Sequence, residues 1–453
     1  MDWLAKTLGL RADERRPFVA GFVSFFLVFV AWYMIRPVRE AMGIARGAGS
    51  LPWLMLGTVI VSLLVNPLYS RLTTRATRTQ LARWVYRFLA VNLLAFYLAL
   101  SVFDEQLGIT GEVRVRVGFV MYVWVSIFSL INNSVLWSLV SERFDSDAGR
   151  RTFGLFAAAC SLGGIVGATI TGVMASAGSE SGYLGIPMGW LPEDFDTLHV
   201  LLMAAGLMWV ASWSASKIVD GPEDSENSVE EEPLDGSVWE GLALVKRSPF
   251  LLGISGYVLM YTIIGTFVYL MQGAIVDALG EGVDEDIQSF AFLDTLTSVG
   301  TLAVQLFGTS IIVRKLGVTF CLGALPLFCA IGLGVLWIWP VYGVLAVFQI
   351  SRRIINYGLA KPARELLFTS VTRAEKYKAK NLIDLFIYRS GDTIGSLTYA
   401  GLRGAGIGGV AIMSVPLSLG WFFLAPFLGR EFERREAAAK VEAADGRGSS
   451  GEA

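Results

Sequence analysis

The sequence predicts an all-α integral membrane protein in which twelve transmembrane helices form two six-helix pseudo-repeats. Of the 453 residues, 54% are hydrophobic and only 17% are charged, whereas a soluble chain carries about 25% charged residues. The apolar runs are continuous and about 20 residues long, as membrane-spanning helices require, and they lack the alternating pattern of barrel strands. A polar segment near the middle of the chain leaves six runs on each side.

Twelve apolar runs account for the membrane spans. Their approximate bounds are 17–34, 51–69, 84–102, 113–140, 152–175, 198–214, 250–276, 287–313, 318–338, 341–368, 381–402 and 407–428. Lys and Arg collect in cytoplasmic loops, and with twelve spans every basic cluster falls on the side of the N-terminus. We therefore expect both termini in the cytoplasm and the protein in the inner membrane of the cell.

The order of these segments predicts four parts of the chain. Residues 1–216 form an N-terminal six-helix bundle, and residues 248–429 form a C-terminal one. Residues 217–247 are acidic and contain Gly and Pro, so they cannot bury a core. They should be a cytoplasmic linker that ends in a short surface helix at 238–247. We expect a disordered cytoplasmic tail at 430–453.

The two halves are alike around one turn in each. LVSERFDSDAGRRTFGLF after the fourth span and LFTSVTRAEKYKAKNLIDLF after the tenth both place a basic loop between two apolar runs. Gly163 and Gly167 in the fifth span have counterparts in Gly391 and Gly395 in the eleventh, and small residues four apart let helices pack closely. A repeat of six spans is the plan of the major facilitator transporters.

The end of the first span carries the charged motif Arg36-Pro-Val-Arg39-Glu40. Arg36 and Arg39 share one helix face, and Arg36 can pair with Glu40 one turn later. The two arginines can grip an anionic substrate, or they can lie at the membrane interface beside Glu40. In the fourth span, Asn132 can hydrogen-bond between helices or, with Tyr122, face a polar cavity.

The tenth span carries more charge than lipid tolerates, because each charge at membrane depth costs roughly 2.5–3.5 kcal/mol on insertion scales. Arg353, Tyr357, Lys361 and Arg364 recur at intervals of four, four and three. Side chains at this spacing form one stripe on a helix. The stripe predicts a positive surface that lines a cavity open to the cytoplasm.

Three acidic residues are candidates for ion pairs that form and break, or for a proton step: Glu40, Asp294 and Asp392. Arg389 and Asp392 in the eleventh span are three residues apart, so they can pair on one face. Asp294 in the eighth span is either a proton site or the buried partner of a cation from the tenth or eleventh span.

Nothing in the sequence indicates an enzyme. There is no Walker motif, which argues against an ATPase, and a single histidine, His199, argues against a histidine metal site. We expect no cofactor and no metal. We also expect a monomer in the lipid bilayer, with no nucleic-acid partner.

Several segments in both halves resemble the nucleotide transporter family, the ATP/ADP translocases of plastids and intracellular bacteria. These segments are Arg36-Pro-Val-Arg39-Glu40, Leu136-Trp-Ser-Leu, Phe144 to Gly154, Gly163 to Gly167, Arg247-Ser-Pro-Phe250, Val304-Gln-Leu-Phe307 with Leu316-Gly317, and Pro362-Ala-Arg-Glu365 to Asp392. The resemblance implies a branch of the major facilitator superfamily that exchanges ATP for ADP or moves nucleotides with protons. The chain departs from the family at Tyr122, where an acidic residue is expected, so the resemblance supports the fold more strongly than the cargo.

Together these observations predict a secondary active transporter that works by alternating access on a small anionic substrate, such as ATP or ADP. Arg36, Arg39, Arg353 and Arg364 would hold the negative groups, with Lys361 and Arg389 as second choices. The first alternative is a proton-coupled exporter of another small metabolite or drug. A membrane enzyme acting on lipid-linked substrates and a sensor that transports nothing are further alternatives.

Overall fold

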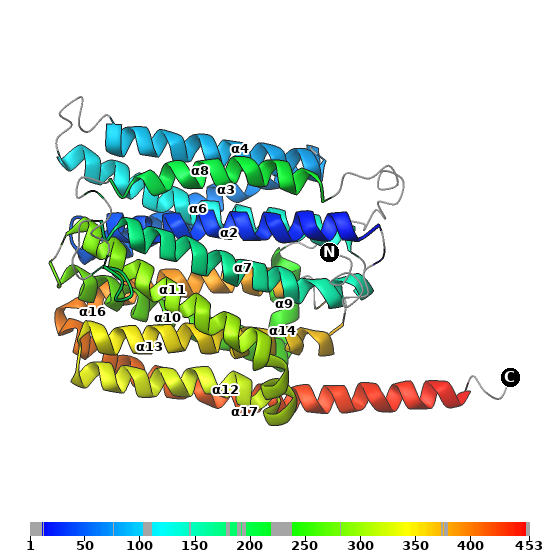
Figure 1. Cartoon of the computed structure of the whole chain (residues 1–453). Coiled ribbons are helices and arrows are strands. Elements are labelled where there is room, and N and C mark those ends of the chain that lie inside the picture. Colours follow the sequence, from blue (N-terminus) through cyan, green and yellow to red (C-terminus); the bar gives the residue numbers. More distant parts are fainter. Residues whose placement is uncertain are drawn as a thin grey trace. The chain divides into compact units, whose positions relative to one another are not determined.

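The computed structural model describes residues 11, 13–75, 77–102, 111–144, 146–177, 182–187, 192, 196–218, 238–280, 282–372, 375 and 379–449. In this part of the chain every regular element is helical, apart from one isolated bridge between Tyr183 and Ile186. Figure 1 shows these long helices, coloured along the sequence from blue near the N-terminus to red near the C-terminus. The prediction of an all-α protein is confirmed.

The chain forms two compact units, which are described separately. The first unit comprises Met1–Val229 and Gly273–Leu302, and the second comprises Glu230–Gln272 and Ala303–Ala453. The division passes through two helices, α10 (Pro249–Asp277) and α11 (Val283–Phe307). The end of α10 and most of α11 therefore pack with the first six spans, although the sequence places them in the C-terminal bundle.

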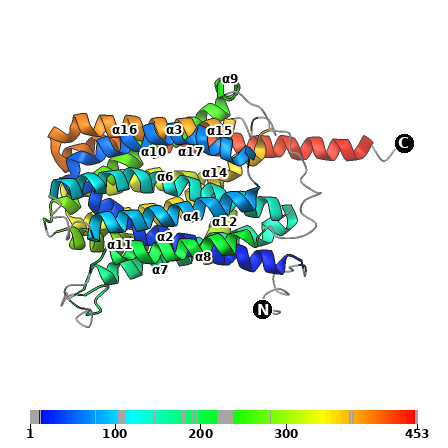
Figure 2. The same cartoon turned by 90° about the horizontal axis from the view of Figure 1, so that it is seen from above.

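The first unit is built around α2. Its elements are α2 (Arg15–Ile44), η1 (Ala48–Ser50), α3 (Leu51–Arg75), α4 (Arg78–Tyr97), η2 (Leu98–Val102), α6 (Gly111–Arg143), α7 (Ser146–Met174) and α8 (His199–Ser216), with the parts of α10 and α11 named above. Helix α2 packs against α6, α7 and α8, and α4 runs beside α8 in both views (Figures 1 and 2). The long apolar helix α2 therefore forms the centre of this unit.

Two glycines of α7 allow its close approach to α2. A Cβ atom at Gly163 would lie 2.7 Å from the carbonyl oxygen of Phe26, and one at Gly167 would overlap the carbonyl oxygen of Val30. Only glycine leaves room for backbone at such a distance. The prediction that the fifth span uses its small residues for helix packing is confirmed.

The second unit is organised around α12 and α17. Its elements are α9 (Val238–Arg247), the first part of α10, α12 (Thr309–Ile338), α13 (Tyr342–Ile355), η3 (Asn356–Ala360), α14 (Lys361–Leu367), η4 (Phe368–Ser370), α15 (Lys380–Leu382), η6 (Ile383–Ile387), α16 (Tyr388–Leu402), η7 (Arg403–Ala405) and α17 (Gly406–Ser449). Helices α12 and α17 run side by side (Figure 1). Gly317, with φ of +78°, breaks α12 where the eighth-to-ninth turn was expected.

Each of the twelve expected spans coincides with a helical run of the structure. Ten runs of the described chain are long and apolar enough to cross a membrane by length and composition alone. The expected tenth span is not among them because of its charges, and α16 and α17 lie together in one run, Tyr388–Ala438. Gly406, with φ of +70°, separates these two helices.

Two parts of the polar sequence can be compared with expectation. The short helix predicted at 238–247 is present as α9, while residues 219–237 of the linker lie outside the described part of the chain. The tail differs, because α17 continues to Ser449 where we expected disorder from residue 430. Its sequence from Glu431 to Ala444 is rich in Ala, Glu and Arg, which favour helix.

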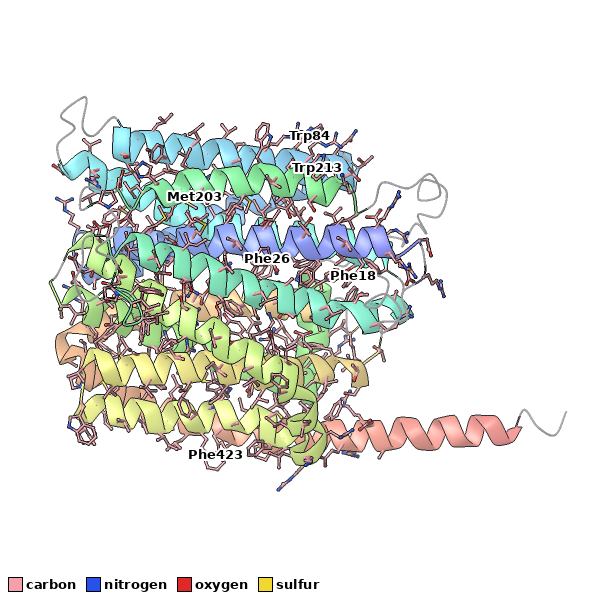
Figure 3. All side chains as sticks on the ribbon, in the orientation of Figure 1. Phe18, Phe26, Trp84, Met203, Trp213 and Phe423 are labelled. Atoms are coloured by element: carbon pink, nitrogen blue, oxygen red, sulfur yellow. The ribbon has the colours of Figure 1, made fainter. Side chains whose placement is uncertain are left out.

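Large apolar side chains project from the outer faces of several helices. In the first unit, Trp84 of α4 and Met203 and Trp213 of α8 are 56%, 45% and 61% exposed (Figure 3). In the second unit, Phe423 of α17 is 70% exposed (Figure 3). Soluble proteins seldom expose large apolar patches, so these faces are suited to lipid.

Candidate functional site

The first unit holds a cluster of two arginines and two carboxylates, the first-helix cluster: Arg36, Arg39, Glu40 and Asp294. Arg36 Nη1 lies 2.9 Å from Asp294 Oδ1, and its Nε lies 3.8 Å from Glu40 Oε1. Arg39 Nη1 donates to Glu40 Oε1 at 2.7 Å. Glu40 and Asp294 are both buried. The predicted Arg36–Glu40 pair is confirmed, and the charges of the cluster balance.

The partner of Asp294 was not foreseen. We expected either a proton site or a pair with a cation of the tenth or eleventh span. The structure pairs it with Arg36 of the first span, 258 residues away in the sequence. Asp294 lies on the part of α11 that belongs to the first unit. A contact between such distant positions leaves no local pattern in the sequence.

The ring of Tyr122 on α6 packs against the guanidinium group of Arg39. The guanidinium carbon of Arg39 lies 4.1 Å from the centre of the Tyr122 ring, and Arg39 Nε donates to the Tyr122 carbonyl oxygen at 3.3 Å. Tyr122 is completely buried, so in this conformation it touches Arg39 and not solvent. Further along α6, Asn132 is buried and its Oδ1 has no hydrogen-bond donor among the described residues.

The tenth span of the second unit is not one regular helix. Residues Asn356–Ala360 form a π-helical segment, η3, between α13 and α14. Such a segment disturbs the regular 3.6-residue spacing, so Arg353 and Tyr357 do not continue into Lys361 and Arg364 as one straight stripe. This corrects our expectation. Tyr357 and Lys361 are exposed, whereas Arg353 is only 5% exposed.

A buried polar chain crosses this part of the second unit. Arg352 Nε donates to Gln349 Oε1 at 2.8 Å, and Gln349 Nε2 donates to Gln272 Oε1 of α10 at 2.6 Å. One turn later, Asn356 Nδ2 donates to the Tyr261 hydroxyl at 3.0 Å. We did not include Gln349, Arg352 or Asn356 among the candidate site residues. Their spacing of three and four residues was the signal that marks them as one polar face.

Arg364 keeps part of its hydrogen-bonding capacity. Its Nη2 lies 3.7 Å from Glu365 Oε1, while Lys380 Nζ approaches Glu365 Oε2 to 2.6 Å. The side chain of Arg364 is only 13% exposed. Its Nε has no acceptor in the part of the chain that the structure describes. A buried guanidinium with a free N–H group is suited to binding an anion.

The predicted pair of the eleventh span is confirmed. Arg389 Nη1 lies 3.3 Å from Asp392 Oδ2, and the hydroxyl of Thr266 donates to Asp392 Oδ1 at 3.4 Å. A second π-helical segment, η6, ends one residue before α16 begins. Segments of this kind are frequent at functional sites.

The two units differ in charge. From Tyr342 to Leu367 and from Lys380 to Leu402, the second unit carries six cations, Arg352, Arg353, Lys361, Arg364, Lys380 and Arg389, and three carboxylates, Glu365, Asp384 and Asp392. The first-helix cluster has two of each sign. The positive excess therefore belongs to the second unit.

In the described residues there is no group of three or more His, Cys, Asp or Glu that could hold a metal ion.

Comparisons with known proteins find a distant relative of part of the chain and solved structures that share the fold of nearly all of it. No family model matches it. It is 26% identical over 234 residues to ADP,ATP carrier protein 2 of Chlamydia trachomatis serovar D, a match that covers 44% of this chain and 41% of the carrier. The chain is a distant homologue of this carrier. The matched part spans about two fifths of the carrier's length.

Solved structures extend the comparison to nearly the whole chain. A bacterial homologue of the human lysosomal transporter Spinster matches with a TM-score of 0.57 and 11% identity, over 94% of this chain and 97% of that one. The nucleoside transporter NupG matches with a TM-score of 0.60 and 10% identity, over 92% of this chain and 99% of that one. A bacterial homologue of the iron transporter ferroportin matches with a TM-score of 0.60 and 13% identity, over 91% of this chain and 98% of that one. The protein is thus a multi-pass membrane protein with a major-facilitator-like fold, as predicted.

Proposed function

We propose that this protein is a secondary active transporter of the inner membrane that moves an anionic substrate, such as a nucleotide, by alternating access. The observation that carries the proposal is the excess of cations over carboxylates in α13 to α16 of the second unit. Five of these cations and the three carboxylates fall within the expected spans 341–368 and 381–402. Since charge at membrane depth costs roughly 2.5–3.5 kcal/mol per residue, the excess of cations there needs a compensating role. The distant homology to an ADP,ATP carrier favours a substrate that bears phosphate.

In the second unit, Arg364 is the first candidate to meet the substrate. Its Nε has no acceptor among the described residues, and an arginine can hold a phosphate with two parallel hydrogen bonds. Lys361 and Tyr357 are exposed and can reach a solvated ligand. Arg353 is buried and adds positive charge to the same span, whereas the charge of Arg389 is balanced by Asp392 in this conformation.

In the first unit, the ion pairs of the first-helix cluster would exchange partners during transport. Arg36 and Arg39 are held by Asp294 and Glu40 in this conformation. An anionic group that approaches the arginines competes with these carboxylates, because each guanidinium has a limited set of donors. Asn132, with a free Oδ1 among the described residues, can accept a hydrogen bond from a base or sugar.

The moving parts in this proposal are the two six-helix bundles, 1–216 and 248–429, joined by the linker at 217–247. Transporters of this plan rock one bundle against the other around a fixed site. The chain has no Walker motif, so exchange or an ion gradient would drive the movement.

Flux measurements test the proposal directly. The purified protein is reconstituted in vesicles, and uptake of labelled ATP, ADP and inorganic anions is measured with and without a pH gradient. We expect uptake of ATP or ADP that is faster when vesicles contain the other nucleotide, if exchange drives it. Absence of anion flux, together with no thermal stabilisation by any anion, contradicts the proposal. Flux of an apolar or cationic compound down a proton gradient would support the exporter instead.

A matched pair of variants assigns the site. Arg364→Gln removes the buried guanidinium, and we expect anion uptake to fall by about tenfold or more, the loss that accompanies a charged hydrogen bond of roughly 1.5–3 kcal/mol. Arg403→Gln makes the same change at an exposed position in η7, after α16. We expect its uptake to stay at the level of the unchanged protein. Equal effects of both changes would show that net charge, and not Arg364, determines uptake.

A further inference from the structure

One face of α11 combines a carboxylate with three hydroxyl groups. Asp294, Thr297, Ser298 and Thr301 lie at relative positions 0, 3, 4 and 7, so they share one side of the helix. Their exposed fractions are 3%, 1%, 4% and 6%. All four belong to the first unit. We call these four residues the hydroxyl face.

The three hydroxyls of this face lack protein partners. In the described part of the chain, no hydrogen-bond partner exists for Thr297 Oγ1, Ser298 Oγ or Thr301 Oγ1. Helical Ser and Thr commonly donate to the carbonyl one turn earlier, as Thr171 and Ser176 of the same unit do. Buried polar atoms without partners are uncommon in proteins, and each calls for an explanation. Three on one helix face, beside a carboxylate, indicate a ligand.

The surroundings show where such a ligand would bind. A Cβ atom at Gly164 of α7 would lie 2.6 Å from Ser298 Oγ and 3.1 Å from a ring carbon of Tyr33 on α2. The Ser298 hydroxyl is therefore directed toward α7, next to α2. On the same face, Asp294 meets Arg36 of α2 at 2.9 Å. The absence of a side chain at Gly164 allows α7 to pack closely against the Ser298 hydroxyl, whose oxygen is buried and has no hydrogen-bond partner among the described residues.

We propose that the first turn of the hydroxyl face is a sodium site, with Asp294 and the hydroxyl oxygens of Thr297 and Ser298 as ligands. Thr301 lies two turns from Asp294, about 10 Å along the helix axis, so it cannot bind the same ion. Hard cations take oxygen ligands, and all three side chains supply oxygen. One carboxylate gives the site a charge of −1, which a monovalent ion neutralises. Calcium and magnesium sites draw on several carboxylates or on phosphates, and a proton on Asp294 would leave the Thr297 and Ser298 hydroxyls without partners.

Arg36 and sodium compete for the same carboxylate. In this conformation the guanidinium of Arg36 neutralises Asp294. An anion that draws Arg36 away would release Asp294 for the cation, so anion and sodium should bind cooperatively. Such a linkage is reciprocal, because each ligand raises the affinity for the other by the same factor. This coupling rests on the proposed function, whereas sodium binding itself does not.

Sodium binding is measured on the purified full-length protein without any substrate. Thermal unfolding is followed by tryptophan fluorescence in sodium chloride, potassium chloride and choline chloride at equal ionic strength, and binding by uptake of labelled sodium. We expect sodium alone to raise the unfolding temperature, and Asp294→Asn to abolish this effect. Arg36→Gln should increase sodium affinity by about tenfold, since a competing cation is removed and typical couplings lie in the range of 5–150-fold.

Two further variants keep the test independent of folding defects. Thr297→Val with Ser298→Ala removes two ligands without changing charge, and should also abolish the sodium effect. Asp284→Asn removes a carboxylate at the start of the same helix, outside the hydroxyl face, and should leave the effect unchanged. The proposal is overturned if sodium stabilises neither the unchanged protein nor Arg36→Gln, or if the double variant still responds. Anion uptake without any sodium binding would leave the transport function intact and remove this site.

Discussion

The helix pair α2–α7 of the first unit and the pair α10–α16 of the second unit pack in the same way. In the first pair, Gly163 and Gly167 lie against the carbonyl oxygens of Phe26 and Val30. In each pair, two glycines four residues apart on one helix, α7 or α16, face two carbonyl groups four residues apart on the other helix, α2 or α10.

The second pair repeats the contact with slightly more space. Cβ atoms at Gly391 and Gly395 would each lie 3.3 Å from a carbonyl oxygen, those of Leu259 and Ile263. The nearest obstacles are the side chains of Thr262 and Thr266 and not backbone atoms. The two halves therefore share one packing scheme, with the backbones closer in the first unit, although a Cβ atom at Gly391 would overlap the Thr262 hydroxyl.

The chemistry next to these glycines differs. In α7 the residue after Gly163 is Gly164, whereas in α16 the residue after Gly391 is Asp392. Gly164 lies next to Tyr33 of α2 and Ser298 of α11, whereas Asp392 bonds Thr266 and Arg389. The first unit takes its carboxylates from α2 and α11 instead. The repeat thus preserves the packing of the backbone, while each half has its own arrangement of charge.

The largest effect is expected where the repeat is tightest. Gly167→Ala places a Cβ atom on the Val30 carbonyl, and overpacking of this kind costs about 1–3 kcal/mol. Gly395→Ala should cost less, because the nearest atom is the Cβ of Thr266 at 2.9 Å and the nearest carbonyl oxygen is 3.3 Å away. Gly154→Ala, a position on α7 with nothing within 4 Å, should be neutral or slightly stabilising. Unfolding temperatures in detergent rank the three variants, and equal losses at Gly167 and Gly395 would contradict the difference in packing.

The next largest effect is expected from removing a paired carboxylate, and the loss of stability should differ between the two units. Asp294→Asn breaks a 2.9 Å pair whose acid is buried, and removing one partner of a buried pair is costly. Asp392→Asn breaks a 3.3 Å pair between neighbours on one helix, in which the acid is more exposed, at 14% against 4% for Asp294. We expect a loss of about 1–3 kcal/mol for the first change and about 1 kcal/mol for the second. Thermal unfolding of both variants measures the difference; a larger loss for Asp392→Asn would reverse the comparison.

The spans and the packing glycines could be predicted from sequence, because both follow from local patterns. Hydropathy marks each apolar run, and glycines four apart mark a close helix contact. The pairs Arg36–Glu40 and Arg389–Asp392 are equally local, at spacings of four and three residues.

The remaining features depend on positions that the sequence does not relate. The Arg36–Asp294 pair joins residues from different halves, and no single sequence specifies which cation reaches a given acid. The π-helical segments η3 and η6 insert an irregularity that a 3.6-residue pattern cannot contain. The predicted stripe of the tenth span failed for this reason. The helical tail could have been predicted from the Ala, Glu and Arg content of residues 431–444, because these residues favour helix.

A smaller effect is expected where a ring supports a cation. In the first unit, Arg39 rests on Tyr122 at 4.1 Å. Tyr122→Leu removes the ring and should cost about 1–2 kcal/mol, because a desolvated cation–π contact has this strength. Tyr122→Phe keeps the ring and should unfold within a degree or two of the unchanged protein. A loss of equal size in both variants would show that the hydroxyl, and not the ring, stabilises Arg39.

The smallest effect is expected in the tail, where the halves differ in length. Helix α8 ends the first half at Ser216, whereas α17 continues to Ser449. Glu431 lies 3.1 Å from Arg435 one turn later, and such pairs contribute about 0.3–0.5 kcal/mol. Glu431→Gln should lower stability by this amount at low salt and by less at high salt, since exposed pairs are screened. Arg435 also packs on the Phe250 ring at 4.6 Å, so Arg435→Gln should cost more than Glu431→Gln. If the two changes cost the same, the tail is held by the ion pair alone, and its packing on α10 contributes nothing to the second unit.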